Sequence, residues 1–278
     1  YTGSTLFICK NNKDMFRDIA MFRPTILVLV PALAEMALNL SKKFGKNMLG
    51  DSLKYIICGA AAVPPYLIHE YKNVFDITLF PGYGLTESAN LVSGNPEALT
   101  HPESVGYIYP GMEVKVVDGE IWLRGENMMD GYVGGADNDI AYEDGWFKTG
   151  DLVRFDEDGF LYITGRIKEI IVLSSGENVS PAELEVKFYE IDGVQDCLVY
   201  DITEGNAQLL VLEILPRVSV LKARGVEDLE AYFKEEVEKI LVLRLGTSQS
   251  VQASCKPTDA NNRQFVLSSS DESIVRIS

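Results

Sequence analysis

Short apolar runs alternate with amphipathic stretches over residues 1–100. The apolar runs have the length of β-strands, and they are "TLFICK", "TILVLV", "LKYIICGA" and "ITLF". The stretches between them have helical spacing, and they are "KDMFRDIAMFR", "PALAEMALNLSKKFG" and "PPYLIHEYKNVF". The second helix is expected to have Pro31 in its first turn and to end at Gly45. Strands that alternate with helices predict a mostly parallel sheet with covered faces, in which "TILVLV" is a buried strand.

From about residue 101 the pattern changes to short strands and tight turns. Asp118-Gly119 and Asp158-Gly159 are dipeptides typical of β-hairpins. Strands and helices alternate again from residue 168, and a helix is expected to begin after Ser180, with Glu183 completing a capping box. The remaining residues are rich in Ser, Thr and Asn, which predicts β-structure. We therefore expect an α/β protein of four segments: an α/β part of a larger core (1–100), a β-rich part of that core (101–167), a small α+β domain (168–240) and a β-rich tail (241–278).

Composition and charge narrow the class of protein. With 46% hydrophobic and 24% charged residues, the chain is globular rather than disordered. A formal net charge of −16 argues against a nucleic-acid-binding protein, and an anionic substrate would need a metal ion and local cations to offset this charge. Four widely spaced cysteines and two histidines argue against a zinc site and fit a reducing cytoplasm. Cys58 and Cys197 lie in apolar runs, so we expect both to be buried.

The sequence contains no stretch that is apolar enough to span a membrane, since "TILVLVPALAEMALNL" is interrupted by Pro31 and Glu35. No targeting segment opens the sequence. We therefore expect a cytoplasmic protein without a transmembrane segment, for which peripheral contact with a membrane stays open. Because the first residue is Tyr1 and not Met, we also expect the chain to be part of a longer protein.

The segment 80–88, "FPGYGLTES", places two glycines, an aromatic ring, a hydroxyl and a carboxylate in one short loop. One interpretation is a turn that leaves a strand, because Pro and Gly are common in turns of every kind. The other is a nucleotide site, in which the ring of Tyr83 faces a base and Glu87 holds a magnesium ion. A loop after such a strand lies at the carboxyl ends of the strands, where α/β sheets bind ligands.

Four more features have two interpretations each. Gly59 and the alanines after it allow either close approach to a flat ligand or tight packing of a helix on a strand. Asp151, in a predicted turn of "GWFKTGDL", can accept hydrogen bonds from the vicinal hydroxyls of a ribose or from local backbone. Arg166 can pair with a phosphate or extend into solvent. The segment "SSGENVSP", which contains Gly176, is either a glycine loop near an anionic ligand or only the approach to the helix cap.

Four blocks in a fixed order resemble the adenylate-forming enzyme superfamily over about residues 1–240. They are "GYGLTE", "GEIWLRGENMMDGY", "GWFKTGDL" and "GRIKEIIVLSSGENVSPAELE". Within the superfamily the chain most resembles fatty acyl-CoA synthetases, because Lys168 is followed by "EIIVLSSGENVSP". The resemblance implies a ligase that uses ATP and Mg²⁺ to convert a carboxylic acid, here a fatty acid, to an acyl-AMP with release of pyrophosphate. The acyl group would then be transferred to coenzyme A.

The resemblance also implies roles for individual residues. Thr86 would bind the α-phosphate and Glu87 the magnesium ion, which makes these two the catalytic residues. Asp151 would accept hydrogen bonds from the ribose hydroxyls, with Arg166 close to the same sugar and phosphate. Gly59, Ala60 and Ala61 would line the adenine pocket, and the ring of Tyr83 would stack on the base. Gly82 and Gly84, on either side of Tyr83, would also belong to the ATP/AMP-binding residues.

The resemblance implies roles for two residues of the C-terminal half, and two segments typical of the superfamily do not occur in the sequence. Lys168 would be the hinge about which the small C-terminal domain rotates, and Gly176 would lie near the pantetheine tunnel. The superfamily's glycine-rich phosphate loop does not occur in the sequence, and neither does its lysine-bearing C-terminal segment. We therefore expect an incomplete enzyme that turns over poorly or not at all by itself. The alternatives are an enzyme that activates an aryl or amino acid, and a truncated non-catalytic module that binds a nucleotide or acts as a scaffold.

The tail resembles part of a different kind of domain. Its sequence, "LRLGTSQSVQASCKPTDANNRQFVLSSSDESIVRIS", is similar to bacterial immunoglobulin-like domains of group 2. It corresponds to less than half of a complete β-sandwich, which alone would leave open sheet edges. A fusion junction, an artefact and a genuine appendage all stay open as its origin.

Overall fold

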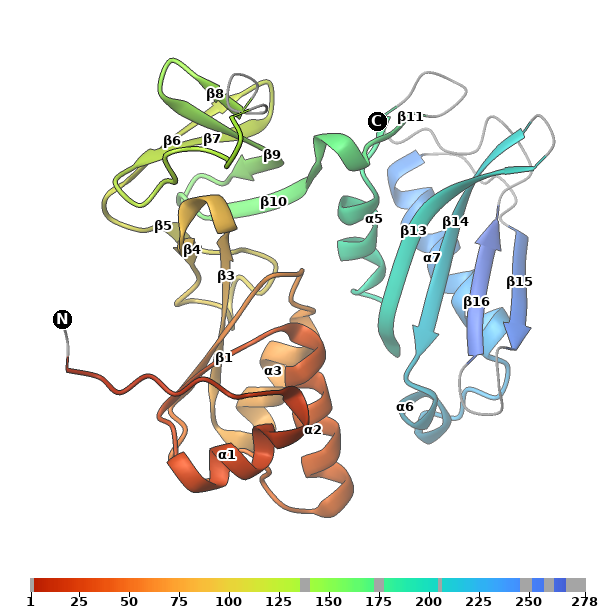
Figure 1. The fold of residues 1–278 in the computed structure, drawn as a ribbon. Coiled ribbons are helices and arrows are strands. Elements are labelled where there is room, and N and C mark those ends of the chain that lie inside the picture. Colours follow the sequence, from red (N-terminus) through yellow and green to blue (C-terminus); the bar gives the residue numbers. More distant parts are fainter. Residues whose placement is uncertain are drawn as a thin grey trace. The chain divides into compact units, whose positions relative to one another are not determined.

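The computed structural model describes residues 3–135, 141–172, 178–204, 207–245, 252–257 and 263–268 (Figure 1). By its internal contacts the chain divides into two compact units. Unit 1 comprises Tyr1–Val116, Trp122–Thr149 and Arg154–Ile163. Unit 2 comprises Val117–Ile121, Gly150–Val153 and Thr164–Ser278.

The α/β part of unit 1 is built on a five-stranded sheet. Its strands, in spatial and chain order, are β1 (Ile26–Leu29), β2 (Tyr55–Cys58), β3 (Thr78–Gly84), β4 (Leu91–Gly94) and β5 (Tyr107–Ile108). The first three strands are parallel, whereas β3, β4 and β5 pair antiparallel. Figure 1 shows the three helices beside the parallel strands, and they are α1 (Met15–Phe22), α2 (Pro31–Phe44) and α3 (Pro65–Phe75). The predicted alternation of strands and helices is therefore confirmed from residue 13 onward.

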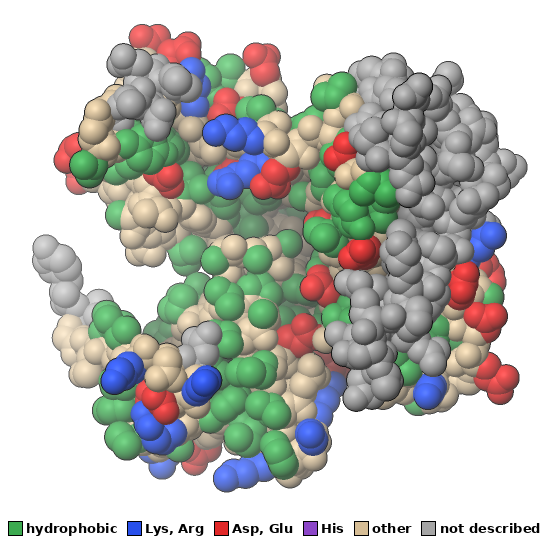
Figure 2. Space-filling model, turned by 45° about the vertical axis from the view of Figure 1, so that its right-hand side comes forward, with side chains coloured by type: hydrophobic (Ala, Val, Ile, Leu, Met, Phe, Trp, Pro, Cys, Tyr) green, Lys and Arg blue, Asp and Glu red, His purple; other side chains and the backbone are tan. Residues whose placement is uncertain are grey.

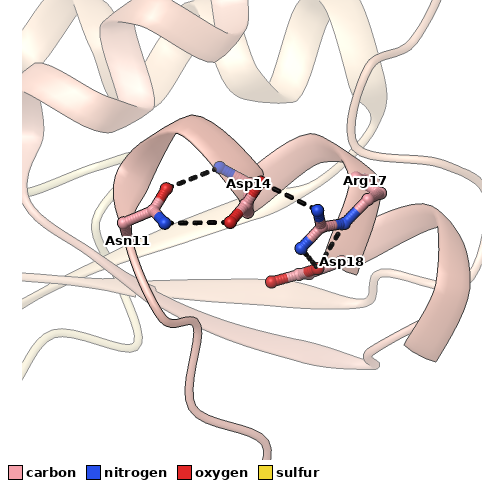
Figure 3. Close-up of polar contacts among 4 residues, drawn as sticks. All are labelled: Asn11, Asp14, Arg17 and Asp18. Carbon is pink, nitrogen blue, oxygen red and sulfur yellow. Dashed lines mark hydrogen bonds and ion pairs between the residues drawn. The ribbon is translucent and has the colours of Figure 1, made fainter.

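Local signals explain where these helices begin and end. In α2, Pro31 occupies the first turn, where its missing N–H is not needed, and Gly45 ends the helix in the left-handed region with φ 58°. At the start of α1, the Asn11 side chain accepts a hydrogen bond from the backbone N–H of Asp14 at 3.1 Å (Figure 3). The guanidinium of Arg17 lies between the carboxylates of Asp14 and Asp18, at 2.9 and 3.0 Å. These bonds fix the entry of the chain into the first helix.

Two expectations for the first strands are wrong. The run "TLFICK" forms no strand, because no described strand pairs with it, and its Leu6 and Ile8 side chains are exposed. The run "TILVLV" does form β1, but it is buried only in part, since Leu29 lies in the core whereas Val28 is 75% exposed. Successive side chains of a strand point to opposite faces, and in this edge strand the face that carries Ile26 and Val28 is exposed. Figure 2 shows apolar side chains exposed over this α/β part.

The β-rich segment forms a second sheet with strand order β10-β9-β7-β6, and β8 pairs with β9. The strands are β6 (Met112–Val117), β7 (Glu120–Gly125), β8 (Tyr142–Glu143), β9 (Trp146–Phe155) and β10 (Leu161–Arg166). Asp118 and Gly119 have φ values of 51° and 84°, as a two-residue hairpin turn requires. At the next turn the Asp156 carboxylate accepts hydrogen bonds from two backbone N–H groups. Both predicted hairpins are confirmed.

Unit 2 contains a four-stranded sheet of order β13-β14-β16-β15, with a helical cover. Its elements are η3 (Ile167–Glu169), β11 (Ile171–Val172), β12 (Asn178–Val179), α5 (Pro181–Phe188), β13 (Val194–Glu204), β14 (Ala207–Pro216), α6 (Val218–Ala223), α7 (Leu229–Leu245), β15 (Gln252–Pro257) and β16 (Arg263–Ser268). The Ser180 hydroxyl accepts the backbone N–H of Glu183 at 3.3 Å, so the predicted N-cap of α5 is confirmed. The core joins α5 and α7 to the sheet through residues such as Phe188 and Phe233.

Two other expectations concern cysteines and the tail. Cys58 and Cys197 are both buried, as predicted. Helix α7 continues to Leu245, past the expected boundary near 241, and β16 of the tail pairs with β14. The four-segment division and the immunoglobulin-like nature of the tail stay predictions. In the described part of the chain, no helix has both the length and the apolar character needed to cross a bilayer.

Candidate functional site

The first candidate group lies where β2 and β3 run side by side in unit 1. Gly59 follows the last residue of β2, and a Cβ atom added there would lie 2.8 Å from the backbone oxygen of Gly82. Only glycine allows this approach, so close packing explains Gly59 by itself. Ala60 has a left-handed backbone with φ 67°, and Ala60 and Ala61 are both exposed. An adenine pocket lined by these three residues stays a prediction.

The segment "PGYG" is not a loop, as the sequence had suggested, but the last part of β3. It pairs antiparallel with β4, so that Gly82 lies opposite Gly94 and Tyr83 opposite Ser93. A Cβ atom on Gly84 would lie 2.5 Å from the backbone oxygen of Asn90. The sheet therefore continues through the glycines, because they let β3 and the chain before β4 come close together. The ring of Tyr83 is half-buried on this strand.

The bend comes after Gly84, in the short 3₁₀ helix η2 (Thr86–Ser88). The Ser88 hydroxyl accepts the N–H of Leu85 at 3.0 Å and donates to the Leu85 carbonyl at 2.9 Å, which closes the turn. Thr86 is exposed and Glu87 is half-buried. A hydroxyl and a carboxylate thus stand next to each other at the end of β3.

Residues from a distant part of unit 1 hold this turn in place. The N–H of Met129 donates to the Glu87 carbonyl at 2.8 Å, and the Asn127 amide donates to the Ser88 carbonyl at 2.9 Å. The Tyr132 hydroxyl donates to Oε1 of Glu87 at 2.8 Å. Asn127, Met129 and Tyr132 belong to the block "GEIWLRGENMMDGY", and the sequence predicted no role for any of them. The sequence feature that could have drawn attention to these residues is the place of their block among the four ordered blocks of the resemblance.

The donor set at η2 fits a magnesium ion. Glu87 supplies a carboxylate and Thr86 a hydroxyl, and both are oxygen donors of the kind that Mg²⁺ prefers. At nucleotide sites Mg²⁺ is held by one or two carboxylates together with phosphate oxygens, so a single protein carboxylate is sufficient. Among the described residues, no three His, Cys, Asp or Glu side chains converge as a metal cluster.

The second candidate group lies in unit 2 and consists of Asp151 and Arg166. Nε of Arg166 donates to Oδ1 of Asp151 at 2.7 Å, although 15 residues separate them. The Asp151 side chain is 7% exposed and that of Arg166 is 48% exposed. Asp151 belongs to β9 and not to a turn, since β9 runs through Gly150, which has φ 74°. The sequence prediction that these two side chains share one site is consistent with this contact.

Glu120 supports the same group, and sequence reasoning missed it. Its Oε1 accepts the backbone N–H of Gly150 at 2.7 Å, across 30 residues of sequence. The bond fixes the backbone immediately before Asp151. A buried carboxylate with a fixed backbone and a half-exposed guanidinium beside it can accept hydrogen bonds from hydroxyls while the guanidinium faces a negative group.

The two remaining candidate residues are Lys168, which the structure describes, and Gly176, which it does not. Lys168 is exposed in η3, directly after β10. Gly176 falls outside the described residues, between β11 and β12, which pair through Val172 and Asn178. The hinge and the tunnel contact therefore stay predictions.

Comparison with known proteins identifies the first part of the chain. Residues 1–133 match the family model for AMP-binding enzyme. This part of the chain belongs to that family. Over 205 residues the chain is 36% identical to 4-coumarate–CoA ligase-like 6 of Arabidopsis thaliana, which covers 66% of this chain and 35% of the relative. Over 139 residues it is 41% identical to the long-chain-fatty-acid–CoA ligase FadD15 of Mycobacterium bovis, which covers 49% of this chain and 23% of that relative.

A solved structure agrees with this AMP-binding assignment. It is o-succinylbenzoate coenzyme A synthetase (MenE) of Bacillus subtilis in complex with ATP and a magnesium ion, with a TM-score of 0.59 and 25% identity over 72% of this chain and 43% of that chain. The chain spans less than half the length of each of these three proteins. The predicted superfamily and α/β fold are confirmed. The two sequence relatives are named for different acids, so likeness alone does not select the acid.

Proposed function

We propose that the protein to which this chain belongs activates a carboxylic acid with ATP and passes the acyl group to coenzyme A. The observation that supports this most directly is the pair of Asp151 and Arg166. The resemblance assigns Asp151 to the ribose hydroxyls and Arg166 to the same sugar and phosphate, and the two side chains, which come from different sequence blocks, are hydrogen-bonded at 2.7 Å. The family match over residues 1–133, which includes Thr86 and Glu87, supplies the other part of the argument.

The proposed reaction has two steps. An oxygen of the acid attacks the α-phosphorus of ATP, and the bond from that phosphorus to pyrophosphate breaks. The thiolate of coenzyme A then attacks the carbonyl carbon of the acyl-AMP, and AMP leaves. Magnesium, when bound, neutralises phosphate charge.

Each residue of the chain has one task in this scheme. The Thr86 hydroxyl donates to an oxygen of the α-phosphate, where negative charge gathers during the attack. Glu87 holds the metal. Asp151 accepts hydrogen bonds from the ribose hydroxyls, and the exposed side of Arg166 faces the phosphate. The ring of Tyr83 stacks on the base. Lys168 is proposed as the hinge, with Gly176 on the coenzyme A side.

For the acid we propose a fatty acid. The block after Lys168 and the 41% identity to a long-chain-fatty-acid–CoA ligase support it. The second candidate is an aryl acid, because the 4-coumarate–CoA ligase-like relative aligns over a longer part of the chain. A panel of fatty and aryl acids, assayed for acid-dependent pyrophosphate release by the protein at its full length, separates the two. ATP, coenzyme A and a cytoplasmic location complete the proposal.

Titration calorimetry of this chain with AMP and with Mg·ATP tests the nucleotide site. Asp151→Ala is expected to weaken AMP binding by about 10–100-fold, because hydrogen bonds to a charged group contribute about 1.5–3 kcal/mol. Glu87→Ala should weaken Mg·ATP and leave metal-free AMP unchanged. Glu157→Ala, on an exposed acid of a turn, is the matched control.

Two results would contradict parts of the proposal, and a third would correct the expectation about the isolated chain. A folded chain that binds neither nucleotide contradicts the nucleotide site. Equal effects of Glu157→Ala and Asp151→Ala contradict the ribose assignment. Steady multiple turnover by the chain alone would contradict the expectation that it is an incomplete enzyme. The same result would also exclude the non-catalytic alternative.

A further inference from the structure

Three hydrogen bonds join the turn that contains Glu87 to residues 127–132. Two of them act on the backbone of η2, since Met129 donates to the Glu87 carbonyl and Asn127 to the Ser88 carbonyl. The third acts on the side chain, since the Tyr132 hydroxyl donates to Oε1 of Glu87 at 2.8 Å. This last bond spans 45 residues of sequence. The segment therefore fixes both the turn and the carboxylate that projects from it.

The turn alone cannot fix that carboxylate. A three-residue 3₁₀ helix provides a single turn of backbone, and a glutamate side chain loses substantial rotamer freedom when it is held in one position. A tyrosine has a rigid ring, so its hydroxyl can hold a partner at a small cost in conformational entropy. In the described part of the chain, Tyr132 is the only residue found to hydrogen-bond the Glu87 carboxylate. The segment is itself tied down, because the Tyr142 hydroxyl donates to the Met129 carbonyl at 2.6 Å.

We propose that Tyr132 is a positioning residue that orients the Glu87 carboxylate for the magnesium ion of Mg·ATP. The proposal rests on the proposed function. A hydrogen bond to one carboxylate oxygen fixes the rotation of the group and leaves the second oxygen to a cation. Carboxylates that hold metals are commonly hydrogen-bonded in this way, and loss of the partner weakens metal affinity by about 10–100-fold. A purely structural role would instead make Tyr132 important for the shape of the loop and equally important for every nucleotide.

The test compares Tyr132→Phe with Tyr66→Phe in the 278-residue chain. Tyr66 is a matched control, because its hydroxyl also donates to a glutamate, Oε1 of Glu35, at 2.7 Å in the same unit. Calorimetry gives the dissociation constants for Mg·ATP over a range of Mg²⁺ concentrations, and for AMP with a chelator present. For Tyr132→Phe we expect Mg·ATP binding to weaken about 10–100-fold while metal-free AMP binding is unchanged. Tyr66→Phe should change neither constant.

A double variant isolates the interaction. If Tyr132 acts through Glu87, then Tyr132→Phe should have no further effect on Mg·ATP binding in a Glu87→Gln background. Equal loss of AMP and Mg·ATP affinity would overturn the proposal in favour of a structural role, and so would a Tyr132→Phe variant that behaves like Tyr66→Phe. These results leave the proposed function intact. A wild-type chain that binds neither nucleotide overturns the proposed function and this inference together.

Discussion

Gly84→Ala tests why glycines flank Tyr83. A Cβ atom at residue 84 would lie 2.5 Å from the backbone oxygen of Asn90 and 2.7 Å from Cα of Leu91. Ordinary contacts begin at 3.4 Å, so the backbone around Asn90 would have to move by 3.4 − 2.5 = 0.9 Å. Both contacted atoms belong to the backbone, so no side-chain rotation relieves the overlap. The shift would separate β3 from the chain that enters β4, next to η2.

Gly82→Ala is the matched comparison, two residues earlier on the same strand. Its Cβ would meet the Leu91 side chain at 3.1 Å and the Ser93 oxygen at 3.2 Å, and shifts of a few tenths of an ångström relieve these contacts. Overpacking of a well-packed site costs about 1–3 kcal/mol, whereas replacing a glycine that tolerates alanine stabilises by about 0.4–1 kcal/mol. We expect Gly84→Ala to lower the free energy of unfolding of unit 1 by about 1–3 kcal/mol. Gly82→Ala should change it by less than about 1 kcal/mol.

Tryptophan fluorescence provides the assay for unit 1. Both tryptophans of the chain, Trp122 and Trp146, belong to unit 1, so urea unfolding followed by their emission reports on that unit. Nucleotide affinity provides the second measurement, and Gly84→Ala should weaken Mg·ATP more than Gly82→Ala does, because the displaced backbone adjoins η2. Equal stabilities for the two variants, or a Gly84→Ala chain as stable as wild type, would refute the steric argument.

Two predictions concern unit 2. Phe233 is fully buried, so Phe233→Ala should lower the free energy of unfolding of unit 2 by about 3–5 kcal/mol, and Phe233→Leu should lower it much less. In urea unfolding of Phe233→Ala, the transition followed by far-UV circular dichroism should move to lower urea, while the transition followed by tryptophan emission should not move. An early shift in tryptophan emission would contradict this. Burial raises the pKa of the Glu185 carboxyl, which accepts the N–H of Val199 at 2.8 Å. A raised folded-state pKa means that stability falls as pH rises from the unfolded pKa through the folded one. Glu185→Gln keeps an acceptor for that N–H and should therefore be more stable than wild type at neutral pH, with a flatter pH profile in urea unfolding. A pH profile of Glu185→Gln that runs parallel to that of wild type would exclude Glu185 as a source of the pH dependence of stability.

The parts of the fold that could be predicted are those set by neighbours in the sequence. Pro31 and Gly45 delimit α2, and Asp118-Gly119 forms its hairpin, because each acts through its own backbone dihedrals. The burial of β1 could not be predicted in this way. An apolar run shows that a segment can be buried, but a strand is covered only if something pairs with it and packs on it, and β1 has a partner on one side only.

In the candidate site, too, local features of the sequence could be predicted and contacts made by the fold could not. The sequence singled out groups that can touch a ligand, such as Glu87 and Asp151, because carboxylates and hydroxyls in glycine-containing motifs indicate chemistry. It missed Tyr132 and Glu120, which touch other protein groups across 45 and 30 residues. Nothing local distinguishes a tyrosine that holds a carboxylate from one on a surface. Only the fold brings the two groups together.

In the proposed nucleotide site, the pairing of Asp151 with Arg166 would also explain how a chain of net charge −16 accepts an anionic nucleotide. A ribose needs an acceptor for its hydroxyls, and a carboxylate is a strong one, but a carboxylate without a partner would repel the phosphates beside it. It would also be costly to bury. Arg166 offsets that charge at 2.7 Å and keeps 48% of its side chain exposed, so the same guanidinium can face a phosphate. The proposed site would therefore bind the sugar through a charged group without adding to the negative field of the protein, and on this proposal the two residues are needed together.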